Sequence, residues 1–169
     1  MTAHQAALEA LTRYFGYDSF RPGQQGIVEA LLAGRDVLGV MPTGAGKSVC
    51  YQIPAALSPG ATLVISPLIS LMRDQVDALN DLGMPAAFIN TTQTPDEQAM
   101  VFAQAAAGQI KLLYVAPERL ETGRFRDFAA RTPISLIAVD EAHCVSQWGQ
   151  DFRSSYLGIG DFIAGLPQR

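Results

Sequence analysis

Short apolar runs alternate along the chain with longer segments in which apolar residues recur every three or four positions. The runs predict strands at 36–41, 61–66, 86–90, 110–116 and 134–140. The first is expected to be buried, and the last two are near-continuous, as in strands buried on both faces of a parallel sheet. Helical spacing predicts helices over 4–15, 22–33, 46–57, 68–82 and 94–108. The alternation predicts an α/β fold, a three-layer domain with a mostly parallel sheet.

Residues typical of helix ends mark several boundaries. Gly16 and Gly34 are expected to stop the first two helices, and Pro22 suits the first turn of the second. Thr94 is expected to cap the last predicted helix, with Pro95 at its first position. In the helix predicted over 68–82, one face is expected to carry Leu68, Leu71, Met72, Val76 and Leu79.

Composition adds limits on size, partners and compartment. At 169 residues, 49% hydrophobic and 17% charged, the chain predicts one globular domain. A net charge of -4 gives no basic footprint, so any contact with nucleic acid must come from a local surface. Cys50 and Cys144 lack disulfide or zinc spacing and are expected to be small packing residues in a reducing cytoplasm. No run approaches the roughly 20 apolar residues of a membrane span, so no membrane partner is expected.

The sequence "TGAGKS" (43–48) follows a predicted strand and opens a predicted helix, the context of a phosphate-binding loop. The general pattern places glycine where Met41 stands, and an ordinary glycine turn is the alternative. In the functional interpretation, backbone N–H groups and the helix N-terminus face the phosphates of a nucleotide. Lys47 adds positive charge, and the Ser48 hydroxyl is expected to bind Mg²⁺. The expected nucleotide-binding residues of this loop are Thr43, Gly44, Ala45, Gly46, Lys47 and Ser48.

The sequence "LIAVDEAH" (136–143) provides an acidic pair at the end of a predicted strand. Ligands of parallel sheets gather at the carboxyl ends of strands. Asp140 is expected to meet Mg²⁺ through water, and Glu141 to orient and deprotonate the attacking water. Taken alone, the pair is equally typical of an exposed acidic turn. Together with the glycine loop, it predicts a Mg-nucleotide site in which Lys47, Asp140 and Glu141 act catalytically.

With "TGAGKS" and "DEAH" in this order, the chain resembles superfamily-two helicases. Four longer segments narrow the resemblance to the RecQ family of DNA helicases: "LTRYFGYDSFRPGQ" (11–24), "VISPLISLMRDQVDAL" (64–79), "LLYVAPERL" (112–120) and "DEAHCVSQWGQDFR" (140–153). They occur in that family's order over about residues 8–162, and helicases of this superfamily tolerate a non-glycine residue at the Met41 position. The resemblance implies a RecA-like P-loop NTPase lobe of a cytoplasmic, nucleoid-associated 3'-5' DNA helicase that uses ATP and Mg²⁺ in repair and recombination.

The resemblance also implies roles in base recognition. Tyr17 would stack on adenine, and Arg21 and Gln24 would contact the base, which favours ATP over GTP. A Gln amide can meet the donor N6 and the acceptor N7 of adenine together. The alternative for Tyr17 and Gln24 is a solvated loop.

For DNA, the resemblance implies that Trp148 and Phe152 stack or wedge against bases and that Arg153 couples DNA contact to the ATP site. Core packing is the alternative for the two aromatic residues. The same resemblance implies further contacts and shows two departures from the family pattern. Ser66 and Arg73 would follow the DNA phosphates, although Arg73 is equally suited to pair with Asp77 at i,i+4. His143 would link the ATP site to the rest of the enzyme or be a structural histidine. As departures, Gln150 stands where the family has His, and Ser154 and Ser155 replace part of an Arg-Pro-x-Tyr tail.

The family's motor has two RecA-like lobes, so residues 1–169 are expected to be a single, truncated ATP-binding lobe. A second motor lobe with its arginine finger, a zinc module and a winged helix would be missing partners. The chain is therefore expected to bind ATP·Mg weakly and not to unwind DNA alone, its DNA partners being single strands and duplex junctions. A non-catalytic nucleotide- or DNA-binding module is the alternative. A small P-loop kinase is disfavoured, because no arginine-bearing lid is evident.

Overall fold

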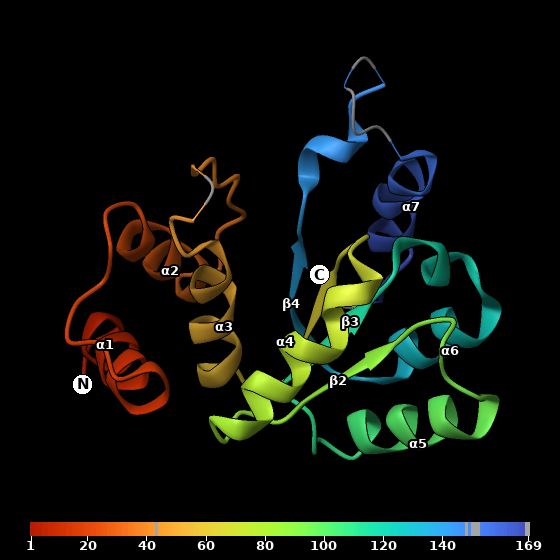
Figure 1. Ribbon diagram of the computed structural model, residues 1–169, viewed down its shortest axis with the longest axis horizontal. Coiled ribbons are helices and arrows are strands. Elements are labelled where there is room, and N and C mark those ends of the chain that lie inside the picture. The colour runs from red at the N-terminus through yellow and green to blue at the C-terminus, as the bar shows by residue number, and fades with distance from the viewer. Residues whose placement is uncertain (43, 148, 150–152, 168–169) are drawn as a thin grey trace.

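A parallel four-stranded sheet forms the centre of the computed structural model, which describes residues 1–42, 44–147, 149 and 153–167. The strand order is β2-β3-β1-β4, and every pairing between neighbours is parallel (Figure 1). The strands are β1 Ala61–Ile65, β2 Ala86–Ile89, β3 Leu112–Val115 and β4 Ile134–Val139. The predicted parallel sheet is thus confirmed for the last four of the five predicted strands.

Helices precede, connect and follow these strands. The α-helices are α1 Ala3–Phe15, α2 Gln24–Leu32, α3 Lys47–Leu57, α4 Ile69–Asp81, α5 Pro95–Ala106, α6 Gly123–Arg131 and α7 Ile159–Ala164. Short 3-10 helices are η1 Pro117–Glu121, η2 Ala142–Val145 and η3 Ser154–Gly158. No helix in the described part of the chain is long and apolar enough to cross a bilayer.

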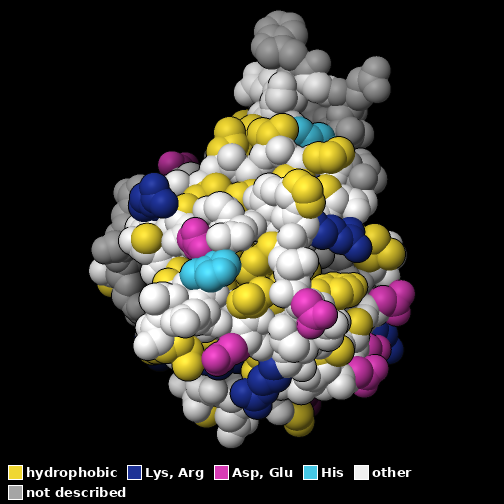
Figure 2. Space-filling view, turned by 90° about the vertical axis from the view of Figure 1, so that its left-hand side faces the viewer, with side chains coloured by type: hydrophobic (Ala, Val, Ile, Leu, Met, Phe, Trp, Pro, Cys, Tyr) yellow, Lys and Arg dark blue, Asp and Glu magenta, His cyan; other side chains and the backbone are white. Residues whose placement is uncertain are grey.

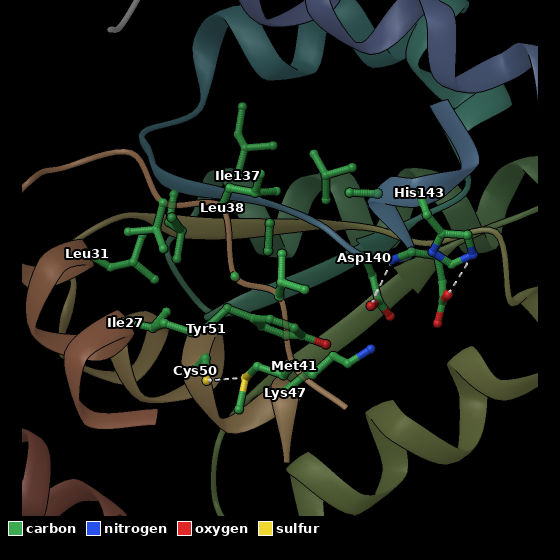
Figure 3. Close-up of a pocket in the computed structure, with 18 residues that line it drawn as sticks. Ile27, Leu31, Leu38, Met41, Lys47, Cys50, Tyr51, Ile137, Asp140 and His143 are labelled. Carbon is green, nitrogen blue, oxygen red and sulfur yellow. Dashed lines mark hydrogen bonds and ion pairs between the residues drawn. The ribbon is translucent and has the colours of Figure 1, made fainter. Parts of the chain in front are cut away.

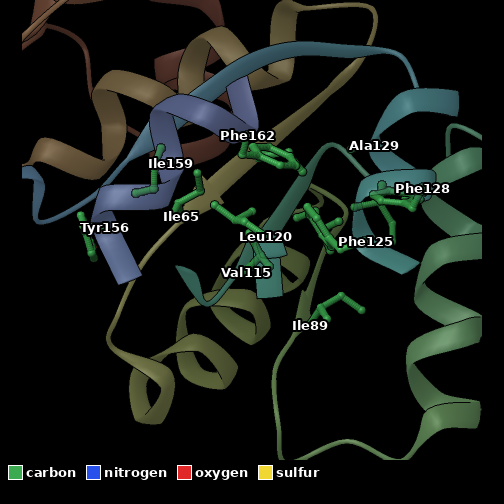
Figure 4. Packing of buried hydrophobic residues seen from close by; sticks show 14 of the residues in the cluster. Ile65, Ile89, Val115, Leu120, Phe125, Phe128, Ala129, Tyr156, Ile159 and Phe162 are labelled. Atoms are coloured by element: carbon green, nitrogen blue, oxygen red, sulfur yellow. The ribbon is translucent and has the colours of Figure 1, made fainter. Parts of the chain in front are cut away.

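Two apolar clusters on opposite faces of the sheet give the three layers predicted from the sequence. On one face, residues of β1, β2 and β3 pack against α5, α6 and α7, with a group of Phe rings at the centre (Figure 4). On the other face, β1, β2 and β3 pack against α3 and α4. A third cluster joins α1 and α2 to the outer side of α3. Each layer buries an apolar helix face, the main favourable term in folding.

Helix ends follow the sequence signals with one exception. Thr2 and Thr94 form capping boxes at α1 and α5, and Gly16 ends α1 at φ 73°, where a left-handed conformation favours glycine. The expectation that Pro22 opens the second helix is wrong. Gly23 is the N-cap residue, with a left-handed backbone at φ 88°, and the helix begins after it at Gln24.

The buried strand predicted over 36–41 is also wrong. The segment 36–41 forms no strand, and Leu38 and Val40 are 81% and 89% exposed. The outer edge of β4 has no strand partner among the described residues, and β4 itself is only partly buried. An apolar run indicates that a segment would gain free energy by burial. A strand of a sheet is buried, however, only where other elements cover both faces of the sheet. No strand among the described residues pairs with this segment, so it has no place in the sheet where it could be buried.

The remaining differences concern helices. In α4 the buried face holds Met72, Val76 and Leu79, whereas Leu71 is half exposed because it lies one residue, about 100°, away from Met72. The helix α6 was not expected, yet Phe125, Phe128 and Ala129 follow the i, i+3, i+4 spacing that would have indicated it.

Val40→Lys is expected to change the free energy of unfolding by less than about 0.5 kcal/mol, because exposed substitutions stay within that range. Val64→Lys, a matched change at a fully buried position of β1, should cost roughly 4 kcal/mol or more. Urea unfolding followed by circular dichroism measures both. Similar costs at the two positions would mean that segment 36–41 is buried in solution, against the structure.

Candidate nucleotide site

The glycine loop, residues 43–48, leads directly into α3. Gly44 and Gly46 have φ of 80° and 78°, which other residues rarely adopt. A Cβ on Gly46 would lie 2.5 Å from Nε2 of Gln24, so a larger residue would also displace the Gln24 amide from the loop. Helix α3 begins at Lys47 without a side-chain cap. Its first-turn N–H groups therefore have no side-chain acceptor, the arrangement that binds anionic groups.

Arg21, in the turn before α2, and Gln24, the first residue of α2, hold the glycine loop from one side. The Gln24 amide donates to the carbonyl oxygens of Gly46 at 2.9 Å and Ala45 at 3.4 Å, and Gln24 is 3% exposed. Arg21 donates from its guanidinium to the carbonyl of Gly44 at 3.1 Å, and its backbone N–H donates to Gln24 Oε1 at 2.8 Å. The structure thus places both residues beside the loop, with Gln24 buried and Arg21 exposed, so the solvated-loop alternative is excluded for Gln24. Their contact with a base stays a prediction.

At the carboxyl end of β4 lies the acidic turn, residues 140–144. The Asp140 N–H continues the sheet ladder by donating to the Ile65 carbonyl at 2.9 Å. Glu141 donates its N–H to Asp140 Oδ1 at 3.0 Å and adopts φ 54° and ψ 43°. It is the one residue other than glycine at positive φ among those described. His143 Nε2 lies 3.5 Å from Glu141 Oε2. The positive φ of Glu141 marks a strained backbone at the second of the two carboxylates.

A pocket of about 630 Å³ brings the two halves together (Figure 3). Lys47 and Tyr51 of α3 point into it from one side, and Asp140 and Glu141 border it from the other. Segment 37–41 and β4 form its apolar walls. The prediction that the glycine loop and the acidic pair lie at one site therefore has direct geometric support, although their catalytic roles stay predictions.

Burial raises the pKa of Asp140, mainly by removing its carboxylate from water, while the Glu141 N–H opposes the shift and the Glu141 charge adds to it. Lys47 and His143 act in the lowering direction. A cation in the pocket would reverse the desolvation effect, because an opposite charge favours the ionised carboxylate.

Asp140→Asn is expected to raise the melting temperature at pH 7. A raised pKa means that the folded chain binds more protons than the unfolded chain, so stability falls as pH rises above the unfolded Asp pKa of about 3.9. The variant escapes this loss, and its advantage should shrink as pH falls towards about 4. Thermal unfolding across pH measures it, with exposed Asp18→Asn as the matched charge control. An advantage that grows on acidification would contradict the assignment.

The donor set fits a nucleotide-bound Mg²⁺ better than an all-protein metal site. Within the described ranges, no group of three or more His, Cys, Asp or Glu side chains could hold a metal ion. Asp140 and Ser48 offer oxygen ligands, which Mg²⁺ prefers, and the ion commonly completes its shell with phosphates and water. The glycine cradle at Gly46 and the uncapped start of α3 fit the phosphates.

Ser66 and Arg73 are the described residues of the segment predicted to follow the DNA phosphates. Ser66 is buried, and its hydroxyl accepts from the Leu68 N–H at 3.2 Å. The Arg73 guanidinium lies over the Phe88 ring at 5.9 Å, and among described side chains no ion pair joins it to Asp77. On the face drawn in Figure 2, Lys and Arg side chains are scattered among acidic and apolar ones. The predicted DNA contacts therefore stay predictions.

Several other predicted residues can be placed only in part. Tyr17 is half exposed and stacks on Phe15, with ring centroids 6.5 Å apart. Arg153 donates its N–H to the Cys144 carbonyl at 3.0 Å. Cys50 and Cys144 are both buried, as expected of packing residues. The predictions for Thr43, Trp148, Gln150 and Phe152 lie outside the described residues.

Two tyrosines near the acidic turn had no assigned role. Tyr51 lines the pocket, and burial raises the pKa of its hydroxyl, with a further contribution from Tyr114. Tyr156 donates its hydroxyl to the Asp140 carbonyl at 2.7 Å. Its buried spacing with Ile159 and Phe162 was a usable signal, because three apolar residues recur at intervals of three.

Comparison with protein families now identifies the chain at the family level. The sequence pattern of the family described as DEAD/DEAH box helicase matches residues 21–168. The chain belongs to the DEAD/DEAH box helicase family. For this helicase-family chain, the expected RecA-like α/β fold is confirmed as well.

Individual relatives of this DEAD/DEAH box helicase chain agree. An ATP-dependent DNA helicase RecQ from Haemophilus influenzae is 52% identical over 161 residues, covering 95% of the chain and 26% of the relative. The protein of the same name from Bacillus subtilis is 49% identical and covers 90% and 26%. The chain thus spans about a quarter of the length of these relatives. A hypothetical ATP-dependent RNA helicase from Sulfolobus tokodaii shares the fold, with a TM-score of 0.65, 21% identity, and coverage of 94% and 45%.

Proposed function

We propose that the chain is the N-terminal ATP-binding lobe of a RecQ-type, ATP-dependent DNA helicase. The observation that carries the proposal is the pocket in which Lys47 faces Asp140 and Glu141 across the carboxyl end of the sheet. The similarity to proteins named RecQ over nine-tenths or more of the chain supports the DNA helicase assignment.

The residues of the pocket can divide the work of ATP hydrolysis. First-turn N–H groups of α3 and the Lys47 ammonium would hold the β- and γ-phosphates. Ser48 and Asp140 would hold Mg²⁺, which when bound neutralises phosphate charge. Glu141, which lines the pocket beside Asp140, would accept a proton from the attacking water.

The finer parts of the proposal concern the whole protein. By its resemblance to the RecQ family, the complete enzyme would move 3' to 5' along DNA and act in repair and recombination. This lobe alone would bind ATP·Mg weakly and give no strand displacement on a forked duplex. In related phosphoryl-transfer enzymes an arginine finger raises the catalytic rate by roughly 10³-fold or more, and here it would come from another lobe. Trp148, Phe152, Arg153, Ser66, Arg73 and His143 would contribute DNA contact and coupling, with Tyr17 on the adenine ring.

A matched pair of glutamines tests the ATP site. Gln24→Ala removes two hydrogen bonds to the glycine loop, so it is expected to weaken binding of a fluorescent ATP analogue by about fivefold or more. If Gln24 also contacts the base as proposed, the preference of the chain for the ATP analogue over a GTP analogue should fall as well. Gln25→Ala changes an exposed neighbour whose amide donates to Glu29 at 3.1 Å, and affinity should stay within about twofold. Equal affinities for both variants and the wild type, or no binding by the wild type, would refute the assignment.

A further inference from the structure

The chain leaves the acidic turn at Cys144 and Val145 and comes back to it at Arg153. Two hydrogen bonds mark the return. The Arg153 N–H donates to the Cys144 carbonyl at 3.0 Å, and the Tyr156 hydroxyl donates to the Asp140 carbonyl at 2.7 Å. The return segment, residues 153–158, is therefore fastened to both ends of the acidic turn.

The Asp140 carbonyl is available because the sheet ladder stops beside it. The Asp140 N–H bonds to the Ile65 carbonyl at 2.9 Å, so a regular parallel ladder would next use the N–H two residues after Ile65. That residue is Pro67, which has no N–H. The Tyr156 hydroxyl occupies the place of the missing donor. The Asp140 peptide is thus held from β1 on its N–H side and from the return segment on its carbonyl side.

The tyrosine is itself held firmly. Tyr156 is 2% exposed and packs in the same cluster as Ile159 and Phe162, which follow it at intervals of three residues through η3 and α7 (Figure 4). Burial raises the pKa of its hydroxyl, so the group remains a protonated donor throughout the ordinary pH range. A fixed ring with a fixed donor restricts the carbonyl that it contacts.

We propose that Tyr156 is a positioning residue for the acidic turn. By fixing the Asp140 peptide, its hydroxyl sets the direction in which Asp140 leaves the sheet and supports the left-handed conformation of Glu141 that follows. The inference rests on the proposed function for its consequence, which is that Mg²⁺ and the attacking water meet correctly aimed carboxylates. Movement of the return segment would reach the acidic turn through the same bond.

The test uses Tyr156→Phe in the 169-residue chain, with Tyr114→Phe as the matched control. Tyr114 is also buried, and its hydroxyl bonds to Gln52 and Tyr51 instead of to the turn. Hydrogen exchange of the 141–144 amides, relative to those of α5, should be about fivefold faster or more in Tyr156→Phe only. The gain in affinity for a fluorescent ATP analogue on adding Mg²⁺ should fall by about fivefold, with affinity in EDTA within about twofold.

Each outcome decides one question. Wild-type exchange and a wild-type Mg²⁺ gain in Tyr156→Phe would overturn the inference while the proposed function stands. A wild-type chain without any Mg²⁺ gain would overturn the proposed function, and the exchange rates would still decide whether Tyr156 holds the turn. If Tyr156→Phe does not fold, 3-fluorotyrosine at position 156 keeps the ring and strengthens the donor, so slower exchange of the turn is expected and unchanged exchange would refute the inference.

Discussion

Lys47→Ala is expected to reduce affinity for ATP·Mg by roughly 10- to 100-fold. Among the described residues that line the pocket, Lys47 alone has a permanent positive charge. Hydrogen bonds to charged groups contribute about 1.5–3 kcal/mol each, which corresponds to this range in affinity. The phosphates would lose their one charged side-chain partner in the pocket, while the N–H groups of α3 would remain.

The chain's other lysine provides the control. Lys111 donates to the Ser58 carbonyl at 2.8 Å, away from the pocket. Lys111→Ala removes the same charge and should leave affinity within about twofold. Titration of a fluorescent ATP analogue with Mg²⁺ measures both variants. If the two losses are equal, the effect is one of overall charge, and the pocket is not the nucleotide site.

Glu141→Gly is expected to stabilise the fold while reducing any hydrolysis by about 10²-fold or more. A residue other than glycine in the left-handed region costs about 1 kcal/mol or more, and glycine adopts this conformation without that cost. Burial is the main cause of the raised pKa of Asp140, and the variant also removes the Glu141 charge that adds to it. A general base contributes about 10²- to 10⁴-fold to a rate. The variant should therefore hydrolyse ATP much more slowly even though its fold is more stable.

Glu141→Gln separates the two contributions. It removes the charge and the base but keeps a side chain at φ 54°, so it should lose hydrolysis equally and gain less stability than glycine. Single-turnover phosphate release and urea unfolding provide the two measurements. A glycine variant no more stable than the glutamine variant would show that the backbone at this position is unstrained.

The sequence predicted correctly those elements that are stabilised by residues close in the chain or by pairing within the described sheet. Thr94 with Pro95 marks the start of α5 in the sequence and in the structure, because a cap acts within a few residues. The run 110–116 became the buried strand β3, which has strands on both sides. The segment 36–41, also mostly apolar, did not become a strand, because apolar character does not specify which neighbour will cover it.

The candidate site shows the same division. The residue types at the glycine loop and the acidic turn identified both halves, because charge and backbone freedom are readable from the chain. The contacts of Gln24 with the loop carbonyls and of Tyr156 with the Asp140 carbonyl were not readable. They join segments 22 and 16 residues apart, and depend on packing that brings a side chain to one particular carbonyl oxygen.

If the pocket binds nucleotide as proposed, its affinity would depend on whatever covers the outer edge of β4, which has no strand partner among the described residues. Segment 37–41 forms one wall of the pocket and leads into the glycine loop, while β4 forms the other wall and leads into the acidic turn. A structure that pairs with this edge would change the spacing of the two walls and hence the fit of the phosphates. By thermodynamic linkage, any factor by which such pairing tightens nucleotide binding is the factor by which the nucleotide tightens the pairing.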